Sequence, residues 1–372
     1  ENAVILPLGY GQENGGQFAA EAGFNTFGLK KNAGMIQGGA TVTKIEGTYT
    51  LANTQDEKGD YSQEIRDRID GLVRKNTISG YTEEQKKTEA GSAVPSVKKY
   101  EVMPKEKLKS LFPVPDNHMT GTQWNKEGQQ WGMTIDLTSC TGCNACAVAC
   151  QAENNVSVVG KKEVANGREM HWLRMDRYFD GDEDNPGSDV QPLGCAPCEN
   201  APCETVCPVA ATVHGPEGTN DIAYNRCIGT RYCANNCPYK VRRFNYYNFS
   251  KRMDDSFGPL IAMQRNPDVT VRFRGVIEKC SFCVQRISEA HIVAKTTGER
   301  TGKVADGGVQ TACQQACSTG AIVFGDVADP KTAVSKRKAS PRNYALLAEL
   351  NIHPRTTYLA RIQNPNPALV EG

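Results

Sequence analysis

Apolar and polar positions alternate with several different periods along the chain, and only a few stretches are regular enough to define an element. Near the N-terminus, residues 4–8 form a short apolar run and residues 41–51 alternate polar and apolar side chains, so both stretches are predicted to be strands. Residues 17–22, between them, have a pattern that could begin a helix. Together these elements predict a mixed α/β segment over residues 1–55.

The next stretch, residues 56–123, is polar, highly charged and interrupted by prolines. Its apolar positions with helical spacing are Ile65, Ile69 and Leu72. The remainder has the composition of an extended linker that wraps a surface.

Two further strand patterns flank the middle of the chain. Residues 131–137 are expected to form a strand that leads into the first cysteine, and residues 321–324 a closing strand. The C-terminal part contains one helical pattern, residues 344–350. Ser340 and Pro341 precede it, and both residue types favour the start of a helix.

Charge and hydropathy identify no general partner. The 372 residues include 43 Lys and Arg against 42 Asp and Glu, and the net charge of +1 gives no long-range attraction to nucleic acid or an anionic membrane. No apolar run approaches the roughly 20 residues of a membrane helix, so no transmembrane segment is expected. The chain starts at Glu1 without a signal-peptide pattern, which suggests a removed leader or the later part of a longer polypeptide.

The fifteen cysteines change this picture, because all of them lie between Cys140 and Cys317. Their odd number argues against a closed set of disulfides. They fall into four groups with short, regular spacing. The groups are Cys140-x2-Cys143-x2-Cys146-x3-Cys150; Cys195-x2-Cys198-x4-Cys203-x3-Cys207; Cys227-x5-Cys233-x3-Cys237; and Cys280-x2-Cys283 with Cys313-x3-Cys317.

Thiols at every third residue of a short loop can reach three corners of a cubane iron–sulfur cluster. In two-cluster ferredoxins the cysteine after such a triplet binds the other cluster, so the groups are expected to work in crossed pairs, the first with the fourth and the second with the third. The predicted ligand sets are Cys140, Cys143, Cys146 and Cys317; Cys280, Cys283, Cys313 and Cys150; Cys195, Cys198, Cys203 and Cys237; and Cys207, Cys227 and Cys233.

The last set lacks one thiol. Four cubanes with four thiolates each need one cysteine more than the chain has, and the missing position between Cys227 and Cys233 is Thr230. A protonated threonine hydroxyl is a poor ligand for iron that prefers thiolate. The sequence therefore predicts three [4Fe–4S] clusters and one [3Fe–4S] cluster, with Thr230 at the vacant ligand position.

Other uses of the cysteines are less consistent with the pattern. Cys280-x2-Cys283 with Cys313-x3-Cys317 also has the spacing of a four-thiolate zinc site, and an exported protein could form disulfides. Neither explains the ferredoxin-like run of four, the Cys-Pro that ends two groups, and the single missing ligand. No cysteine pair is followed by His, so no covalent haem of the usual kind is expected.

Residues 130–326 resemble the four-cluster iron–sulfur subunits that accompany molybdopterin oxidoreductases such as polysulfide, dimethyl sulfoxide and nitrate reductases. Five motifs narrow the resemblance to the iron–sulfur subunit of bacterial alternative complex III. These are Cys140-Thr-Gly-Cys-Asn-Ala-Cys, Cys150-Gln-Ala-Glu-Asn-Asn, Gly167-Arg-Glu-Met-His-Trp-Leu-Arg, Cys227-Ile-Gly-Thr-Arg-Tyr-Cys and Tyr358-Leu-Ala-Arg-Ile.

This resemblance implies an α+β fold of two fused bacterial-ferredoxin-like cluster-binding units with long wrapping loops. In that family a cofactor-free molybdopterin-type domain precedes the cluster module, so no molybdopterin is expected in this chain. Residues 1–55, with Leu6-Pro-Leu-Gly-Tyr-Gly, resemble the last piece of that domain. The expected domains are this remnant over 1–55, an extended linker over 56–123, the four-cluster ferredoxin-like domain over 124–328 and a C-terminal wrapping tail over 329–372.

The resemblance also implies a role in a respiratory complex at the inner membrane. An integral-membrane subunit would oxidise quinol, the clusters would relay the electrons with the [3Fe–4S] cluster as first acceptor, and a multihaem cytochrome c subunit would receive them. The chain itself would carry no catalytic residue and would lie peripherally at the periplasmic face. Two alternatives stay open: the electron-transfer subunit of an active molybdopterin oxidoreductase, and a zinc-stapled interaction scaffold.

Basic and aromatic side chains alternate over residues 240–249, a pattern that some nucleic-acid-binding proteins also show. Because the stretch follows Cys237-Pro238 directly and the net charge is close to zero, packing beside a cluster and subunit docking are favoured. No nucleic-acid partner is therefore expected.

Overall fold

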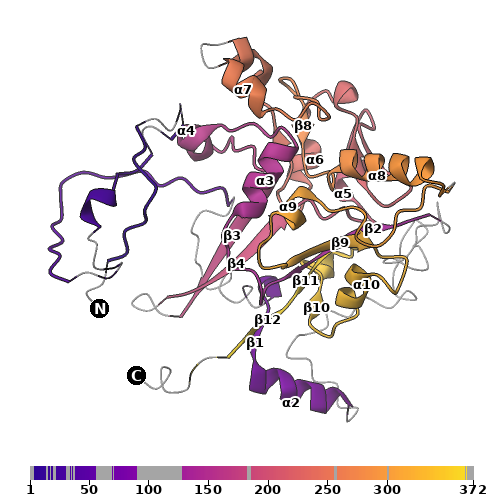
Figure 1. Cartoon of the computed structure of the whole chain (residues 1–372), viewed down its shortest axis with the longest axis horizontal. Helices are drawn as coiled ribbons and strands as arrows, with labels where there is room; N and C mark the ends of the chain where they lie inside the picture. Colours follow the sequence, from indigo (N-terminus) through magenta and orange to yellow (C-terminus); the bar gives the residue numbers. More distant parts are fainter. Residues whose placement is uncertain are drawn as a thin grey trace. The chain divides into compact units, whose positions relative to one another are not determined.

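The computed structural model in Figure 1 describes residues 4–13, 16, 18–19, 22–30, 34, 36, 38–55, 69, 71–89, 128–181, 186–254, 258–299, 301–364 and 366. The chain divides into two compact units. The first comprises Glu1–Thr54 with Val158–Glu169, and the second Gln55–Ser157 with Met170–Gly372. All fifteen cysteines belong to the second unit, so the candidate site is built within one unit.

The first unit has little regular structure among its described residues. Its elements there are the 3-10 turn η1 (Phe27–Leu29) and the helix α4 (Gly160–Ala165). The strands predicted over residues 4–8 and 41–51 are wrong. Their apolar side chains are largely exposed, Ile5 for example by 92%, because no neighbouring strand among the described residues pairs with them. The helix start predicted over residues 17–22 falls partly outside the described residues.

A four-stranded sheet lies at the centre of the second unit, in the order β10-β11-β2-β9. Strand β2 (Trp131–Asp136) pairs antiparallel with β9 (Ile322–Asp326) and parallel with β11 (Thr356–Leu359), and β10 (Asn343–Tyr344) is antiparallel to β11. Every residue of β2 is buried. The strands predicted over residues 131–137 and 321–324 are thus confirmed.

The helix predicted over residues 344–350 is wrong. Tyr344 belongs to β10, and only Ala348–Leu350 form a turn of 3-10 helix, η5. The ring of Tyr344 packs against Tyr358 with 5.8 Å between centroids, and its hydroxyl donates to the carbonyl of Leu72 at 3.1 Å. This packing against distant residues outweighs the local helical pattern.

The remaining described strands form four two-stranded ladders. They are β3 (Leu173–Asp180) with β4 (Gly187–Gly194), β5 (Thr212–His214) with β6 (Asn220–Ile222), β7 (Arg243–Phe244) with β8 (Ile277–Glu278), all antiparallel, and β1 (Lys75–Thr77) parallel with β12 (Arg361–Gln363). The fold is therefore mixed α/β with small sheets. The fusion of two ferredoxin-like units and the predicted domain boundaries stay predictions.

The helices of the second unit are mostly short. They are α2 (Ile78–Glu89), α3 (Ala145–Glu153), α5 (Pro202–Thr205), η3 (Tyr224–Arg226), α6 (Tyr232–Asn235), η4 (Phe249–Asp254), α7 (Gly258–Gln264), α8 (Val284–Thr296), α9 (Ala312–Gln315) and α10 (Ala333–Lys338). In the helical pattern predicted around residue 65, Ile69 and Leu72 are helical and Ile65 lies outside the described residues. No helix in the described part of the chain has the length and apolar character to cross a membrane.

Candidate cluster-binding site

Short helices bring the cysteine groups together in pairs. Helix α3 carries Cys146 and Cys150 and packs against α9, which carries Cys313 (Figure 1). Helix α5 carries Cys203 and packs against α6, which carries Cys233. The first cysteine group therefore meets the fourth, and the second meets the third.

Within these pairs the thiols are close electrostatic neighbours, and none of the fifteen forms a disulfide. Burial is the largest cause of a raised pKa for one thiol of each predicted set, and neighbouring thiols raise the pKa further. These neighbours are Cys143 and Cys317 for Cys140; Cys280, Cys283 and Cys313 for Cys150; Cys195, Cys203 and Cys237 for Cys198; and Cys207 and Cys227 for Cys233. For these four thiols the neighbours are those that the crossed pairing assigns together. Cys146 is also affected by Cys313 and Cys280 by Cys195, which belong to other sets, so the assignment to individual clusters stays a prediction.

Backbone N–H groups point at two of the thiols that follow a helix. The N–H of Ala211 donates to the sulfur of Cys207 at 3.2 Å, and that of Ala321 to the sulfur of Cys317 at 3.3 Å. In both turns the residue before the donor has a positive φ, 48° and 62°. Burial raises the pKa of each thiol, but the hydrogen bonds outweigh it and the pKa is lowered overall. The two turns thus stabilise negative charge on sulfur, as a thiolate ligand requires.

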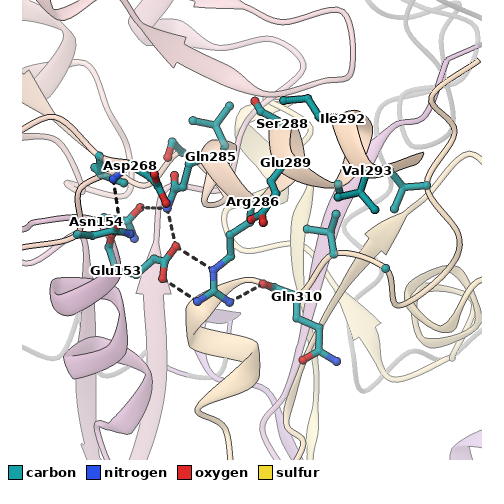
Figure 2. A pocket seen from close by; sticks show the side chains of 18 of the residues that line it. Glu153, Asn154, Asp268, Gln285, Arg286, Ser288, Glu289, Ile292, Val293 and Gln310 are labelled. Atoms are coloured by element: carbon teal, nitrogen blue, oxygen red, sulfur yellow. Dashed lines mark hydrogen bonds and ion pairs between the residues drawn. The ribbon is translucent and has the colours of Figure 1, made fainter. Parts of the chain in front are cut away.

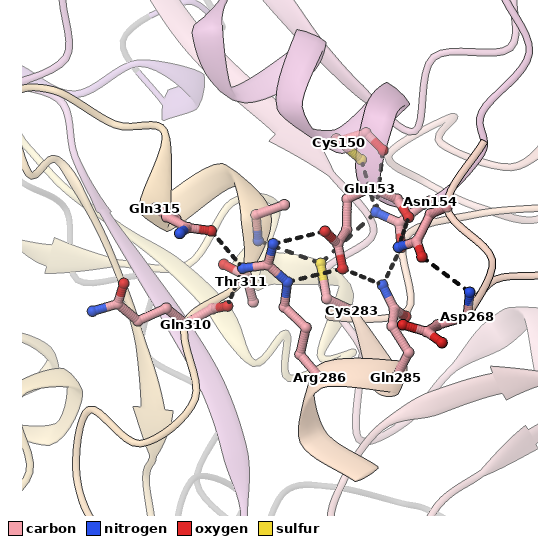
Figure 3. A network of polar contacts seen from close by, with 12 residues as sticks. Cys150, Glu153, Asn154, Asp268, Cys283, Gln285, Arg286, Gln310, Thr311 and Gln315 are labelled. Atoms are coloured by element: carbon pink, nitrogen blue, oxygen red, sulfur yellow. Dashed lines mark hydrogen bonds and ion pairs between the residues drawn. The ribbon is translucent and has the colours of Figure 1, made fainter. Parts of the chain in front are cut away.

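Side chains approach the sulfurs of another predicted set. The amide nitrogen of Asn154 lies 3.7 Å from the sulfur of Cys150 and 3.8 Å from that of Cys283 (Figure 3). The hydroxyl of Thr311 lies 3.2 Å from the sulfur of Cys313. Hydrogen bonds to sulfur are among the means by which proteins set the potential of iron–sulfur clusters.

An ion pair fixes the helices that flank these thiols. Arg286 at the start of α8 binds Glu153 at the end of α3 through two hydrogen bonds of 2.6 and 2.8 Å (Figure 3). Gln285 donates to the same carboxylate at 2.9 Å, and Arg286 also donates to the carbonyl of Gln310 at 2.9 Å. The contacts hold α3, α8 and the segment before α9 together.

The same residues form part of a groove of about 1550 Å³ along α8 (Figure 2). Ile292 and Val293 line it and are half exposed or more. None of the described cysteines lines this groove. It therefore lies beside the thiols and is not the space that they enclose.

Two buried cations lie among the thiols of the second and third groups. Arg242 is 5% exposed and donates to the sulfur of Cys203 at 3.0 Å and to the side-chain oxygen of Asn220 at 2.8 Å. Lys279 is 1% exposed and donates to the carbonyls of Asn220 and Cys280. Within the described residues neither forms a salt bridge with a carboxylate.

A buried cation without a counter-charge is costly, so an anionic group beside these thiols would stabilise both. A cluster ligated by thiolates is such a group. The buried free thiols, the donors aimed at sulfur and the two unpaired cations all fit iron–sulfur clusters. No set of three or more Cys, His, Asp or Glu side chains in the described part converges closely enough to hold a single metal ion.

Thr230 and three thiols line a second, smaller cavity. Cys207, Cys227 and Cys233 contribute to its wall together with Thr230 itself. The other lining residues are mostly apolar: Pro208, Val209, Ala211, Thr212, Ile222, Ile228, Gly229, Arg231 and Ile277. The set predicted to lack a fourth thiolate is thus brought to one cavity, with the threonine at its edge.

The sequence pattern identified the thiols but missed the groups that act on them. Arg242 lies in the basic and aromatic stretch that was assigned to packing and docking, and the structure adds a hydrogen bond to a thiol. No pattern pointed to Lys279, and Asn154 appeared only within the motif Cys150-Gln-Ala-Glu-Asn-Asn, without a role of its own. The role of each depends on its position beside sulfurs from other cysteine groups.

Comparison with known proteins adds a family relationship, although no family model matches the sequence. The menaquinone reductase iron–sulfur cluster-binding subunit of Nitratidesulfovibrio vulgaris is 40% identical over 238 residues, 62% of this chain and 89% of the relative. The Hdr-like menaquinol oxidoreductase iron–sulfur subunit 1 of Archaeoglobus fulgidus is 34% identical over 251 residues, 63% of this chain and 84% of the relative. The arsenate respiratory reductase iron–sulfur subunit of a Shewanella species is 29% identical over 250 residues, 61% and 95% of the two chains.

Proposed function

Because the chain belongs to the family of iron–sulfur cluster-binding subunits of oxidoreductases, we propose that it is the electron-transfer subunit of a membrane-associated complex that exchanges electrons with quinol. The observation that carries this proposal is that fifteen free thiols, seven of them buried, lie within one unit in which α3 packs against α9 and α5 against α6. The names of two relatives, a menaquinone reductase subunit and a menaquinol oxidoreductase subunit, support quinol as the redox partner.

The proposed cofactors are three [4Fe–4S] clusters and one [3Fe–4S] cluster. Cys207, Cys227 and Cys233 would hold the [3Fe–4S] cluster in the cavity that Thr230 borders. The other twelve cysteines would hold the cubanes in the sets predicted from the sequence. These assignments are supported by the neighbouring thiols and by the apolar wall of the small cavity.

When bound, the clusters supply one-electron transfer. The residues of the chain bind and insulate them. Thiols such as Cys146 and Cys203, 7% and 9% exposed, keep water away from the cluster faces. The N–H groups of Ala211 and Ala321 place positive partial charge on two ligand sulfurs, so their thiolate form is favoured.

We further propose the arrangement found in alternative complex III. Quinol is oxidised in an integral-membrane partner, this chain relays the electrons, and a multihaem cytochrome c subunit among its partners receives them at the periplasmic face. In membranes that contain the whole complex, a menaquinol analogue should reduce first the clusters and then the haems. Haems that stay oxidised while the clusters become reduced would exclude this cytochrome acceptor.

Low-temperature EPR of the air-oxidised protein, with iron and zinc counted on the same sample, tests the cluster assignment. We expect the near-isotropic signal of an oxidised three-iron cluster and the iron content of three cubanes plus that cluster. Four-cluster iron without the signal would mean that Thr230 or water completes a fourth cubane. Stoichiometric zinc without iron would instead establish a zinc-stapled scaffold and refute the electron-transfer function.

One observation favours a second function, transfer of electrons to an active molybdopterin subunit. The arsenate respiratory reductase subunit at 29% identity and a further relative, a selenate reductase subunit at 30%, are named as parts of enzymes that reduce a substrate. Molybdenum in the purified complex at one atom per chain would favour this alternative. Its absence from an active quinol-oxidising complex would exclude it.

A further inference from the structure

Buried positive charge is distributed unevenly over the four thiol sets. Arg242 donates to the sulfur of Cys203 at 3.0 Å and also acts electrostatically on Cys233. These two thiols belong to different predicted sets. Lys279 acts on Cys195 and Cys203, which belong to one set. The two cations therefore overlap on one set, and Arg242 also acts on the set that contains Cys233.

The two arginines that act on the other two sets are paired with carboxylates. Arg286 is paired with Glu153 at 2.6 Å, and Arg361, which acts on Cys140, is paired with Asp189. A paired cation and carboxylate produce much weaker fields at a distance than an unpaired charge does. The net positive field is therefore concentrated on the second and third cysteine groups.

Asn220 holds both unpaired cations in place. Its side-chain oxygen accepts from Arg242 at 2.8 Å, and its main-chain carbonyl accepts from Lys279. Its amide nitrogen donates to the carboxylate of Glu204, which also contacts His214 at 3.3 Å. Glu204 therefore bonds to the bridging asparagine and to the histidine, and within the described residues it forms no hydrogen bond or salt bridge with either cation. Asn220 is itself 1% exposed, so water screens these charges little.

We propose that Arg242 and Lys279 raise the reduction potential of the clusters beside them. Arg242 acts on two clusters, the cubane of the set that contains Cys203 and the cluster of the set that contains Cys233. Lys279 acts on that cubane, and its hydrogen bonds go to the carbonyls of Asn220 and Cys280 and to no thiol of the three-iron set. A fixed positive charge and a hydrogen bond to sulfur both favour the reduced cluster, which carries one more electron. The inference rests on the proposed function, and it predicts that electrons reside preferentially on these two clusters.

Potentiometric titration of the purified complex, followed by EPR, tests the proposal. Arg242→Gln should lower the potentials of the three-iron signal and of one cubane. A tenfold change in each one-electron equilibrium corresponds to about 59 mV, and we expect at least this shift. Lys279→Met should lower the potential of the same cubane and leave the midpoint potential of the three-iron signal unchanged. Arg242→Lys keeps the charge, so both potentials should stay close to their wild-type values.

Lys338→Met is the matched control. Its side-chain nitrogen is also enclosed, and burial lowers its pKa to about 7, so the comparison is made at a pH below 7, where it is charged. It donates to the carbonyl of Arg355 and the hydroxyl of Thr357, both at 2.9 Å. Removing it should leave all the potentials unchanged. Equal shifts in Lys338→Met and Lys279→Met would show a general effect of losing a buried cation and would overturn the proposal.

Iron content separates failure of this inference from failure of the proposed function. Full iron with unmoved potentials in Arg242→Gln and Lys279→Met would refute the inference alone, whereas wild-type protein without iron would refute the function. If Arg242→Gln does not retain its clusters, Lys279→Met and Arg242→Lys decide. If Lys279→Met lowers the potential of the cubane and leaves that of the three-iron cluster unchanged, the proposal is supported. If the cubane potential in Lys279→Met does not change, the proposal is overturned.

Discussion

Thr230 stands in its loop at the position that Cys143 takes in the loop of the first cysteine group. Each is preceded by a glycine with a positive φ, 72° before Thr230 and 69° before Cys143. Each is followed by a residue that has a left-handed φ although it is not glycine, 62° and 66°. Both side chains are exposed. The backbone therefore presents a hydroxyl where the other loop presents a thiol.

Thr230→Cys is expected to supply the missing thiolate. Because the residues on either side of Thr230 have the φ values of those beside Cys143, the three-iron cluster should take up a fourth iron and become a cubane. EPR of the oxidised protein should lose the three-iron signal, and the iron content should rise by one atom per chain. Thr230→Ala is the matched control and should keep the signal. A three-iron signal of wild-type intensity in Thr230→Cys would contradict the ligand assignment.

The pairing of the cysteine groups could be predicted because the chemistry behind it is local, while the role of each cysteine as a ligand stays a prediction. Only a few residue types bind iron, and short loops fix the spacing at which thiols reach one cluster. The strand over residues 131–137 was equally predictable, since all six residues of β2 are buried and the apolar pattern marks them.

Elements that depend on distant contacts could not be predicted. Tyr344 lies in a strand because its ring packs against Tyr358 and its hydroxyl reaches Leu72, and no local pattern contains those partners. Arginine and lysine usually lie at the protein surface, so nothing in the sequence indicated that Arg242 and Lys279 are buried. Their burial depends on how α5, α6 and β8 pack around the thiols, which no local pattern describes.

Arg286→Ala should weaken the attachment of α8 to α3. It removes two charge-assisted hydrogen bonds to Glu153 at 2.6 and 2.8 Å, a loss of about 2 kcal/mol for a partly buried pair. The midpoint of guanidinium unfolding, followed by cluster absorbance, should fall accordingly. Arg168→Ala breaks a more exposed Arg–Glu pair at 3.2 Å and should cost less than about 1 kcal/mol. Equal losses in both variants would argue against a clamp at Arg286.

The ion pair of Asp136 with Arg342 should make stability depend on acid pH. Burial raises the pKa of Asp136, but Arg342 at 2.8 Å and the N–H of Thr138 outweigh it, so the pKa lies below its ordinary value of 3.8. The contribution is therefore complete above the pKa of the unfolded chain, about 3.9, and is lost as the pH falls through the lower folded pKa.

Asp136→Asn isolates this contribution. The difference in unfolding midpoint between wild type and variant should be full at about pH 6 and should shrink towards about pH 3. Acid damage to the clusters affects both proteins, so the difference cancels it. A difference that stays constant over this interval would mean that Asp136 contributes through its hydrogen-bonding shape and not through its charge.

Removing the iron should open the region between α5 and α6 before it opens the central sheet. The small apolar cluster there consists of Ala201, Cys203, Cys233 and Ile277, so two of its four members are proposed ligands. Without iron these thiols become neutral, since burial raises the pKa of Cys203 to about 12. Arg242 and Lys279 then lose the anionic group beside them, and unpaired buried charge favours an open state.

Hydrogen–deuterium exchange of the iron-free protein measures this opening. Peptides that contain α5 and α6 should exchange faster than in the loaded protein, while β2 and β9 keep most of their protection. Binding of a metal group is part of the folding free energy of such segments, so a sample reloaded with iron and sulfide should recover its protection. Identical exchange in both forms would show that the thiol sets are preorganised. In that case another group of the chain must neutralise the charges of Arg242 and Lys279.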